Sequence, residues 1–164
     1  MKELLELLEK DARYTPKQLS AMLGKEQAEV EDYIDYAEAE GTILGYSAII
    51  DWDKARGDEK QGDTVSALIE VKITPQRGDG FDRIAERIYQ YDEVESLYLM
   101  SGSFDLAVFI TGKSIKEISQ FVFARLALIE GVTATATHFI MKKYKEKHRV
   151  FEKAPEQEER LLLV

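Results

Sequence analysis

The sequence predicts an α+β protein with two domains, a helical N-terminal domain and a C-terminal domain ordered βαββαβ. Two observations carry this prediction. Apolar residues recur at helical spacing before residue 54, whereas alternating strand-like runs separated by two helical segments follow residue 63. Between them lies KARGDEKQGD, residues 54–63, which has two glycines and no large apolar side chain. We therefore expect a linker there.

The composition is typical of a globular protein and excludes several kinds of chemistry. The chain has 164 residues, 45% hydrophobic and 32% charged, which allows one or two small cores. It has no cysteine, so disulfides, thiolate metal sites and cysteine nucleophiles are excluded. No apolar run has the length of a signal peptide or a membrane span. We expect a cytoplasmic protein without membrane association.

Three helices are expected in the N-terminal domain, residues 1–53. Leucines at helical spacing in MKELLELLEK predict the first, and a second begins at the capping residue Thr15 and ends before a glycine. The third is expected over 26–40, again with a glycine at its end. Residues 42–51, TILGYSAIID, are rich in β-branched and aromatic residues and predict a small hairpin or wing packed on the helices. This order is that of a winged helix-turn-helix.

The second domain, residues 64–145, is expected to form an antiparallel ferredoxin-like sheet with both helices on one face. A sheet with apolar residues on its helix-free face commonly dimerises through it, so we expect a homodimer. The alternative is an exposed, semi-polar sheet. The predicted strands are 65–73, 95–100, 105–111 and 132–141, and the predicted helices are 81–91 and 115–130.

Three strings in the chain resemble the Lrp/AsnC, or feast/famine, family of transcriptional regulators. They are Ser101-Gly102-Ser103-Phe104-Asp105, Gly131-Val132 with Thr135 and Thr137, and Gly41 to Tyr46, GTILGY. The resemblance covers about residues 1–145. It implies a DNA-binding head, a RAM/ACT-like domain that senses amino acids and dimerises, and assembly of dimers into rings, often octamers.

In the resembled family the amino-acid effector sits by a Gly-x-x-Asp turn. That assigns Ser101, Gly102, Ser103, Phe104 and Asp105, with Thr135, to effector binding here. The turn has a physical rationale, because glycine lets backbone approach a ligand, amides hold a carboxylate and an aspartate attracts an ammonium group. In the alternative interpretation Gly102 only makes the hairpin turn and Asp105 caps it.

The expected recognition helix is strongly acidic, which bears on DNA binding. Residues 25–40 contain one lysine and seven acidic residues, a net charge of -6, and such a surface repels phosphate. We therefore predict that duplex DNA contacts the donors at the entrance of the motif, which are Lys17, Gln18, Lys25 and Gln27. The alternative function is a ligand-sensing or protein-interaction module whose helix-turn-helix no longer binds duplex DNA.

Two further segments carry signals. Residues 142–149, KKYKEKHR, hold five cations and one acid around a tyrosine, and could contact nucleic acid, the acidic head of a neighbouring subunit or only solvent. In the C-terminal extension, 146–164, the apolar end Arg160–Val164 is expected to dock as an added strand or an arm.

No catalytic or metal-binding set accompanies these segments. The chain lacks a nucleophile with a base and a phosphate-binding glycine loop, and its His138 has no second ligand nearby and is expected to be packed. We expect neither an enzyme nor a cofactor or metal, apart from a possible amino-acid effector.

Overall fold

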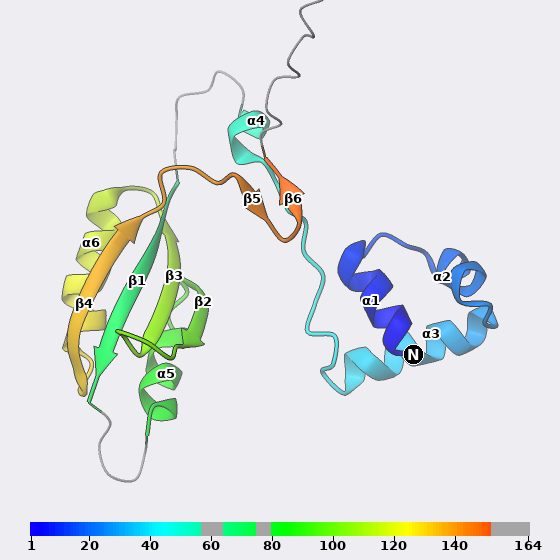
Figure 1. The fold of residues 1–164 in the computed structure, drawn as a ribbon, viewed down its shortest axis with the longest axis horizontal. Helices are drawn as coiled ribbons and strands as arrows, with labels where there is room; N and C mark the ends of the chain where they lie inside the picture. The colour runs from blue at the N-terminus through cyan, green and yellow to red at the C-terminus, as the bar shows by residue number, and fades with distance from the viewer. Residues whose placement is uncertain (57–63, 75–79, 152–164) are drawn as a thin grey trace, which may run out of the picture. The chain divides into compact units, whose positions relative to one another are not determined.

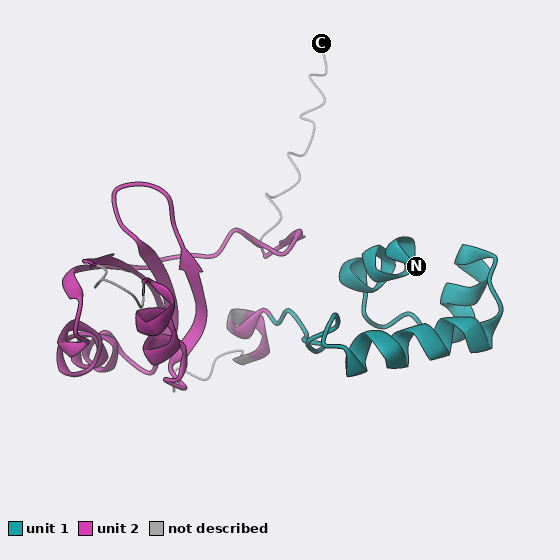
Figure 2. Ribbon diagram, turned by 90° about the horizontal axis from the view of Figure 1, so that it is seen from below, with its two compact units in different colours: residues 1–50 teal, residues 51–164 magenta. Residues whose placement is uncertain are grey.

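The computed structural model describes residues 1–56, 64–74 and 80–151. The chain divides into two compact units, Met1–Ile50 and Asp51–Val164 (Figure 2). The expected linker begins inside a short helix, α4 (Trp52–Arg56), and the rest of it, residues 57–63, lies outside the described residues.

Unit 1 contains the three predicted helices, α1 (Lys2–Lys10), α2 (Pro16–Leu23) and α3 (Gln27–Ala39). They form because each presents an apolar stripe to the other two. The buried members of the core are Leu4, Leu8, Leu19 and Val30, with half-buried leucines, tyrosines and isoleucines around them.

A three-residue turn joins α2 to α3. The Thr15 hydroxyl accepts the Gln18 N–H at 3.3 Å, and the Gln18 amide oxygen accepts the Thr15 N–H at 2.9 Å, so a reciprocal capping box starts α2. Gly24 ends α2 in the left-handed conformation with φ 62°, which lets the chain turn sharply into α3.

The expected wing is absent, and this prediction is wrong. Residues 42–50 contain neither helix nor strand. Ile43 packs against the helical core, whereas Leu44 is 94% exposed and Tyr46, Ile49 and Ile50 are also exposed. β-branched residues favour a strand only where another strand pairs with them, and none among the described residues pairs with this segment.

Unit 2 contains the predicted four-stranded antiparallel sheet, in the order β2-β3-β1-β4 (Figure 1). Helices α5 (Asp82–Tyr89) and α6 (Ile115–Ala124) cover the same face, as expected for the split βαβ arrangement. The strands are β1 (Val65–Ile73), β2 (Val94–Leu99), β3 (Leu106–Gly112) and β4 (Val132–Phe139).

The core of unit 2 lies between the sheet and the two helices. Alternate residues of the central strands point into it, and buried isoleucines of α5 and α6 cover them. The predicted helix over 115–130 is interrupted, because Arg125 leaves helical geometry with φ -126° and ψ -62° and a 3-10 turn, η1 (Leu126–Leu128), follows. Ile115, the first residue of α6, is 56% exposed and lies outside this core.

Gly131 fixes the approach of β4 to α5. Its φ is +93°, and a Cβ at this position would lie 2.7 Å from Cδ1 of Ile84. A side chain is therefore strained by the backbone conformation and would also force the Ile84 side chain to shift.

A second sheet, a short hairpin of β5 (Lys145–Glu146) and β6 (Arg149–Val150), was not predicted. It extends across the expected end of the second domain at residue 145. The predicted docking segment Arg160–Val164 lies outside the described residues.

Candidate functional site

The turn between β2 and β3 brings Ser101 to Asp105 together at one end of the sheet. The Asp105 carbonyl accepts the Met100 N–H at 2.8 Å, which closes the turn, and the Asp105 N–H donates to the Val71 carbonyl at 3.0 Å, which fixes the turn to β1. Ser101, Gly102 and Ser103 are exposed, so their backbone is open to a small molecule.

Asp105 has a structural role in this turn. Its Oδ2 accepts the backbone N–H of Ile73 at 2.7 Å, and the residue is half-buried. The carboxylate therefore satisfies a backbone donor at the end of β1, which agrees with the capping interpretation. It also places a negative charge at the base of the turn, so the effector interpretation is compatible with the same geometry.

Gly102 is not required by the conformation of the turn. Its φ does not lie in the left-handed region, and a Cβ there would meet no atom within 4 Å. The space in front of Gly102 is open, which is what close approach of a ligand to its backbone needs.

Thr135 is separated from the turn within one chain. It lies on β4 directly opposite Val71, while Leu106 of β3 lies opposite Val71 on the other side. Strand β1 therefore stands between Thr135 and the turn. The structure groups the five turn residues but does not bring Thr135 to them.

A cleft of about 410 Å³ between α5 and β2 adjoins the turn and was missed in the sequence. Leu99 and Leu106, which flank the turn in the chain, both line it, and Phe81 and Ala85 form its helical side.

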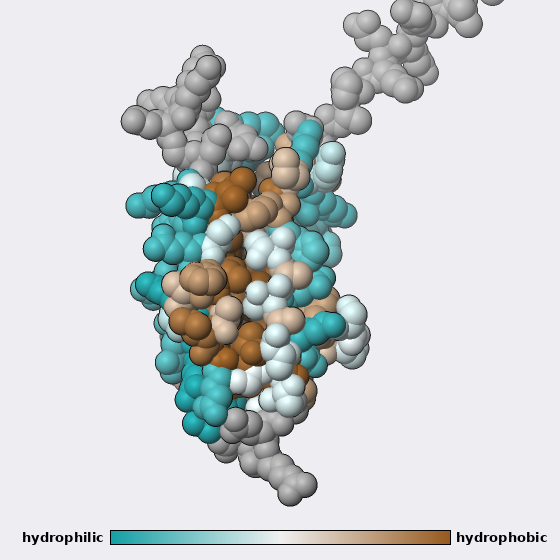
Figure 3. All heavy atoms as spheres, turned by 90° about the vertical axis from the view of Figure 1, so that its left-hand side faces the viewer, coloured by the Kyte–Doolittle hydropathy of each residue, from teal (hydrophilic) through white to brown (hydrophobic). Residues whose placement is uncertain are grey.

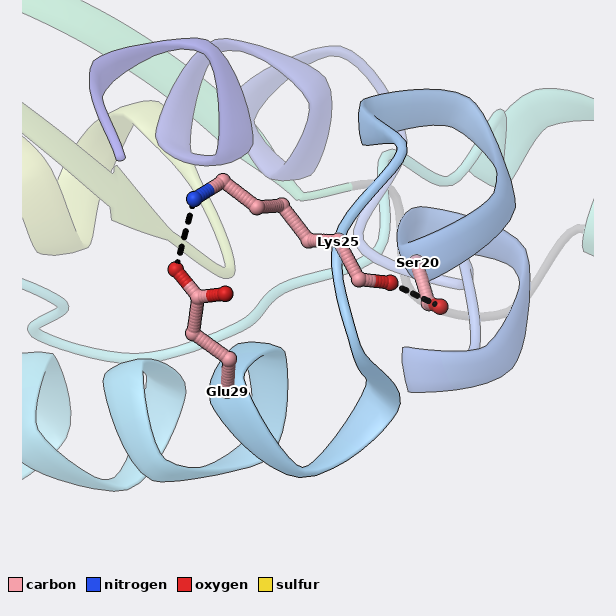
Figure 4. Close-up of polar contacts among 3 residues, drawn as sticks. All are labelled: Ser20, Lys25 and Glu29. Atoms are coloured by element: carbon pink, nitrogen blue, oxygen red, sulfur yellow. Dashed lines mark hydrogen bonds and ion pairs between the residues drawn. The ribbon is translucent and has the colours of Figure 1, made fainter.

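The four predicted DNA-contacting residues lie at two places, Lys17 and Gln18 in the first turn of α2 and Lys25 and Gln27 at the entrance of α3, and three of them have intramolecular partners. Nζ of Lys25 lies 2.7 Å from Oε1 of Glu29, and its carbonyl accepts the Ser20 hydroxyl at 2.6 Å (Figure 4). Gln27 donates to Glu31 at 2.8 Å. The Gln18 amide oxygen belongs to the capping box, so only Lys17 forms no ion pair or hydrogen bond with a described side chain.

Acidic side chains dominate the surface of α3 beyond these pairs. Asp32, Asp35 and Glu38 are all exposed. The Tyr46 hydroxyl donates to Oε1 of Glu38 at 2.8 Å, and partial burial together with this hydrogen bond raises the pKa of the Tyr46 phenol. The phenol therefore stays a neutral donor at physiological pH.

The helix-free face of the sheet has an apolar centre. Leu68 and Phe109 are half-buried opposite one another, and the Tyr98 ring, 54% exposed, stands edge-on to Phe109 with centroids 6.0 Å apart. His138 was expected to be packed, but its side chain is 56% exposed on this face with Nε2 3.3 Å from Oε1 of Glu70. The side chain is exposed in this chain, so the packing prediction is wrong.

A second apolar surface lies on the side of α6 and β4. Figure 3 views this side and shows apolar side chains gathered in a strip between hydrophilic flanks. Phe123 on α6 is 81% exposed and Leu128 on η1 is 75% exposed.

Residues 1–56, 64–74 and 80–151 contain neither a metal-binding cluster nor a membrane-spanning helix. No group of three histidine or acidic side chains there is arranged to hold a metal ion. None of the helices in these segments combines the length and apolar character needed to cross a bilayer.

Residues 66–150 match the family described as the Lrp/AsnC ligand binding domain. YugG of Bacillus subtilis, which is named an HTH-type transcriptional regulator, is 47% identical over 150 residues, spanning 92% of this chain and 88% of YugG. FL11 of Pyrococcus furiosus, also named an HTH-type transcriptional regulator, is 25% identical over 88% of this chain and 89% of its own.

Solved structures share the fold. The regulator NMB0573 of Neisseria meningitidis, solved as a complex with L-Met, has a TM-score of 0.66 at 21% identity and covers 87% of this chain and 88% of its own. Escherichia coli AsnC has a TM-score of 0.63 at 17% identity, with 87% and 91% covered.

Proposed function

The chain belongs to the Lrp/AsnC family, whose members are transcriptional regulators and not enzymes, and we propose that it binds duplex DNA through unit 1 and an amino acid through unit 2. The match to YugG over nearly the whole chain is the observation that carries this proposal. A regulator of this kind acts in the cytoplasm.

The DNA contact is assigned to α2 and α3 as a helix-turn-helix. Two helices joined by a three-residue turn with a left-handed glycine have the geometry of that motif. Lys17 and Gln18 lie in the first turn of α2, and Lys25 and Gln27 lie at the entrance of α3. In such motifs the N-terminal residues of the second helix reach base edges. Lys25 and Gln27 then contact DNA only after leaving Glu29 and Glu31.

The DNA proposal is tested by measuring the affinity of the protein for duplex fragments of genomic upstream DNA at several salt concentrations. We expect the logarithm of the affinity to fall linearly with the logarithm of salt concentration, with a slope of about -0.9 for each phosphate neutralised. A duplex of scrambled sequence is the control for specificity. Absence of binding even at low salt would contradict the proposal.

The acidity of α3 favours a second candidate. With one lysine against seven acids over residues 25–40, the helix is suited to a protein with a basic surface. In this case unit 2 still senses a ligand, but unit 1 is a protein-interaction module. Retained amino-acid binding together with failed DNA binding would select this function.

The effector is proposed to lie against the turn Ser101–Asp105. Exposed backbone amides there can hold its carboxylate, Asp105 can attract its ammonium group, and the adjoining cleft with Phe81 and Leu99 offers space for an apolar side chain. Thr135 can join such a site only from a neighbouring copy, because β1 separates it from the turn in its own chain. Ring assembly of dimers remains part of this proposal.

Dimerisation is proposed through the helix-free face of the sheet. Tyr98→Glu should dissociate the dimer at micromolar concentrations, because the interface would have to bury an unpaired carboxylate beside Leu68 and Phe109. Sedimentation velocity of the full chain measures the result.

Phe123→Glu is the matched control for the dimer prediction. It makes the same aromatic-to-acid change on α6, in the second apolar surface, and should leave the dimer intact. Dissociation by Phe123→Glu and not by Tyr98→Glu would assign the interface to the α6 side instead.

A further inference from the structure

The β5–β6 hairpin turns tightly at Lys147 and His148. These two residues have φ 41° and 67°, and Glu146 and Arg149 pair directly on either side of them. Two consecutive positive φ values in a two-residue hairpin loop are the pattern of a type I′ turn.

The residues at the tip are unusual for this turn. Type I′ turns strongly favour Asn-Gly or Asp-Gly, because side chains with a Cβ are disfavoured at positive φ. Here the first position of the tip carries the long cationic side chain of Lys147, and the second carries the imidazole of His148. Backbone held in unfavoured regions occurs preferentially at functional sites, so these side chains are themselves candidates for a contact.

The base of the hairpin is closed by one hydrogen bond and linked to α4 by another. The Phe151 N–H donates to the Tyr144 carbonyl at 3.0 Å, and Nζ of Lys54 donates to the Phe151 carbonyl at 2.9 Å. Nζ of Lys54 also forms an ion pair with Oδ2 of Asp51, at 3.0 Å. The base of the hairpin is therefore linked to α4 through Lys54.

The hairpin is strongly cationic. Residues 142–149 carry five lysines and arginines and one glutamate. Lys143 lies 3.4 Å from Glu146, and Lys142 lies 5.1 Å from the Tyr144 ring centroid. Lys145 and Lys147 are exposed and form no ion pair with any described residue, so their charges are available to an anionic partner.

Charge distribution points to the partner. Residues 1–50, which form unit 1, carry five basic and eleven acidic side chains, so the proposed DNA-binding unit has few cations for phosphate. DNA affinity depends on neutralised phosphates, and a two-stranded ribbon is one of the elements that fit a DNA groove. From these observations we infer that the β5–β6 hairpin is a second DNA contact, which binds the phosphate backbone through Lys145 and Lys147. This inference rests on the proposed DNA-binding function.

Two variants of the full chain test the inference. Lys145→Gln with Lys147→Gln removes two charges that form no ion pair within the described part of the chain. Lys147→Asn with His148→Gly installs the preferred type I′ pair, so it removes cationic character from the tip while favouring the hairpin itself. Lys113→Gln with Lys116→Gln removes the same number of exposed charges near the start of α6 and is the control.

Affinity is measured against salt concentration on an upstream duplex and on a scrambled one. For the Lys145 and Lys147 variant we expect a slope shallower by about 2 and an affinity lower by about tenfold at low salt, equally for both duplexes. The Asn-Gly variant should also bind more weakly although its hairpin is favoured. The control should match the wild type.

The remaining outcomes distinguish failure of DNA binding by the protein from failure of the hairpin contact alone. If wild type does not bind DNA, the proposed function fails. If wild type binds but both hairpin variants keep its affinity and slope, only the present inference fails. If neutralising the hairpin strengthens DNA binding, the hairpin instead docks on the acidic α3 of a second copy and competes with DNA, which also overturns the inference.

Discussion

Replacing Glu29 and Glu31 by glutamine should strengthen binding of duplex DNA by roughly thirtyfold at low salt, or about 2 kcal/mol. Two effects add. Lys25 and Gln27 are released from partners at 2.7 and 2.8 Å, an exchange that costs little because exposed pairs contribute about 1 kcal/mol or less. Two negative charges are also removed close to the expected path of the phosphates, each worth about 1 kcal/mol in water at 4 Å.

A control variant separates this local effect from a change in net charge. Glu3→Gln with Glu9→Gln removes the same charge from exposed positions of α1 and should change affinity much less. Thermal unfolding checks the fold, because Glu29 lies in the first turn of α3, where a carboxylate contributes about 0.3–1 kcal/mol. Equal affinity gains in both double variants would show that α3 does not face the DNA.

Asp105 allows charge to be separated from structure at the proposed effector site. Asp105→Asn keeps an oxygen that can accept the Ile73 N–H, so its free energy of unfolding should stay within about 1 kcal/mol of wild type. It removes the charge that attracts an ammonium group, so calorimetry should show amino-acid affinity reduced about thirtyfold or more, on the scale of a lost charged hydrogen bond of about 2 kcal/mol or more.

Asp105→Ala should lower both the stability of the protein and its affinity for the amino acid. It leaves the Ile73 N–H without its acceptor, which costs about 1–3 kcal/mol of stability, and it also loses the ligand. Asp92→Asn, at an exposed position outside the turn, is the control. If Asp105→Asn binds amino acids as tightly as wild type, the carboxylate only caps β1 and the effector site must be sought elsewhere.

The sequence was sufficient for the elements whose signal is local. The capping box at Thr15 predicts the start of a helix, and the alternation along β1 predicts a strand. The order of these elements then predicts the topology of the sheet. The wing failed because the strand tendency of Leu44 to Ile50 needs a pairing partner that local composition does not reveal. The β5–β6 hairpin was not predicted because Lys147 and His148, which form its turn, are not residue types that usually form turns.

The candidate sites divide in the same way. Gly102 and Asp105 could be singled out as a motif, but only the structure shows that Asp105 accepts the Ile73 N–H from a strand more than thirty residues earlier. That Lys25 and Gln27 contact DNA stays a prediction. Their engagement by Glu29 and Glu31 follows from i, i+4 spacing, yet which side chains pair depends on rotamers that spacing does not specify.

The central position of β1 has a consequence for synthesis of the chain on the ribosome. Ala67 pairs with Ile110 on one side and with Phe139 on the other, so β1 is made first among the strands and acquires its second neighbour last. During elongation both edges of this apolar strand stay unpaired until most of the domain has emerged from the ribosome. Nascent chains with unpaired, apolar strand edges are prone to misassociate, so correct folding of unit 2 depends on the growing chain being kept apart from its neighbours until β4 closes the sheet.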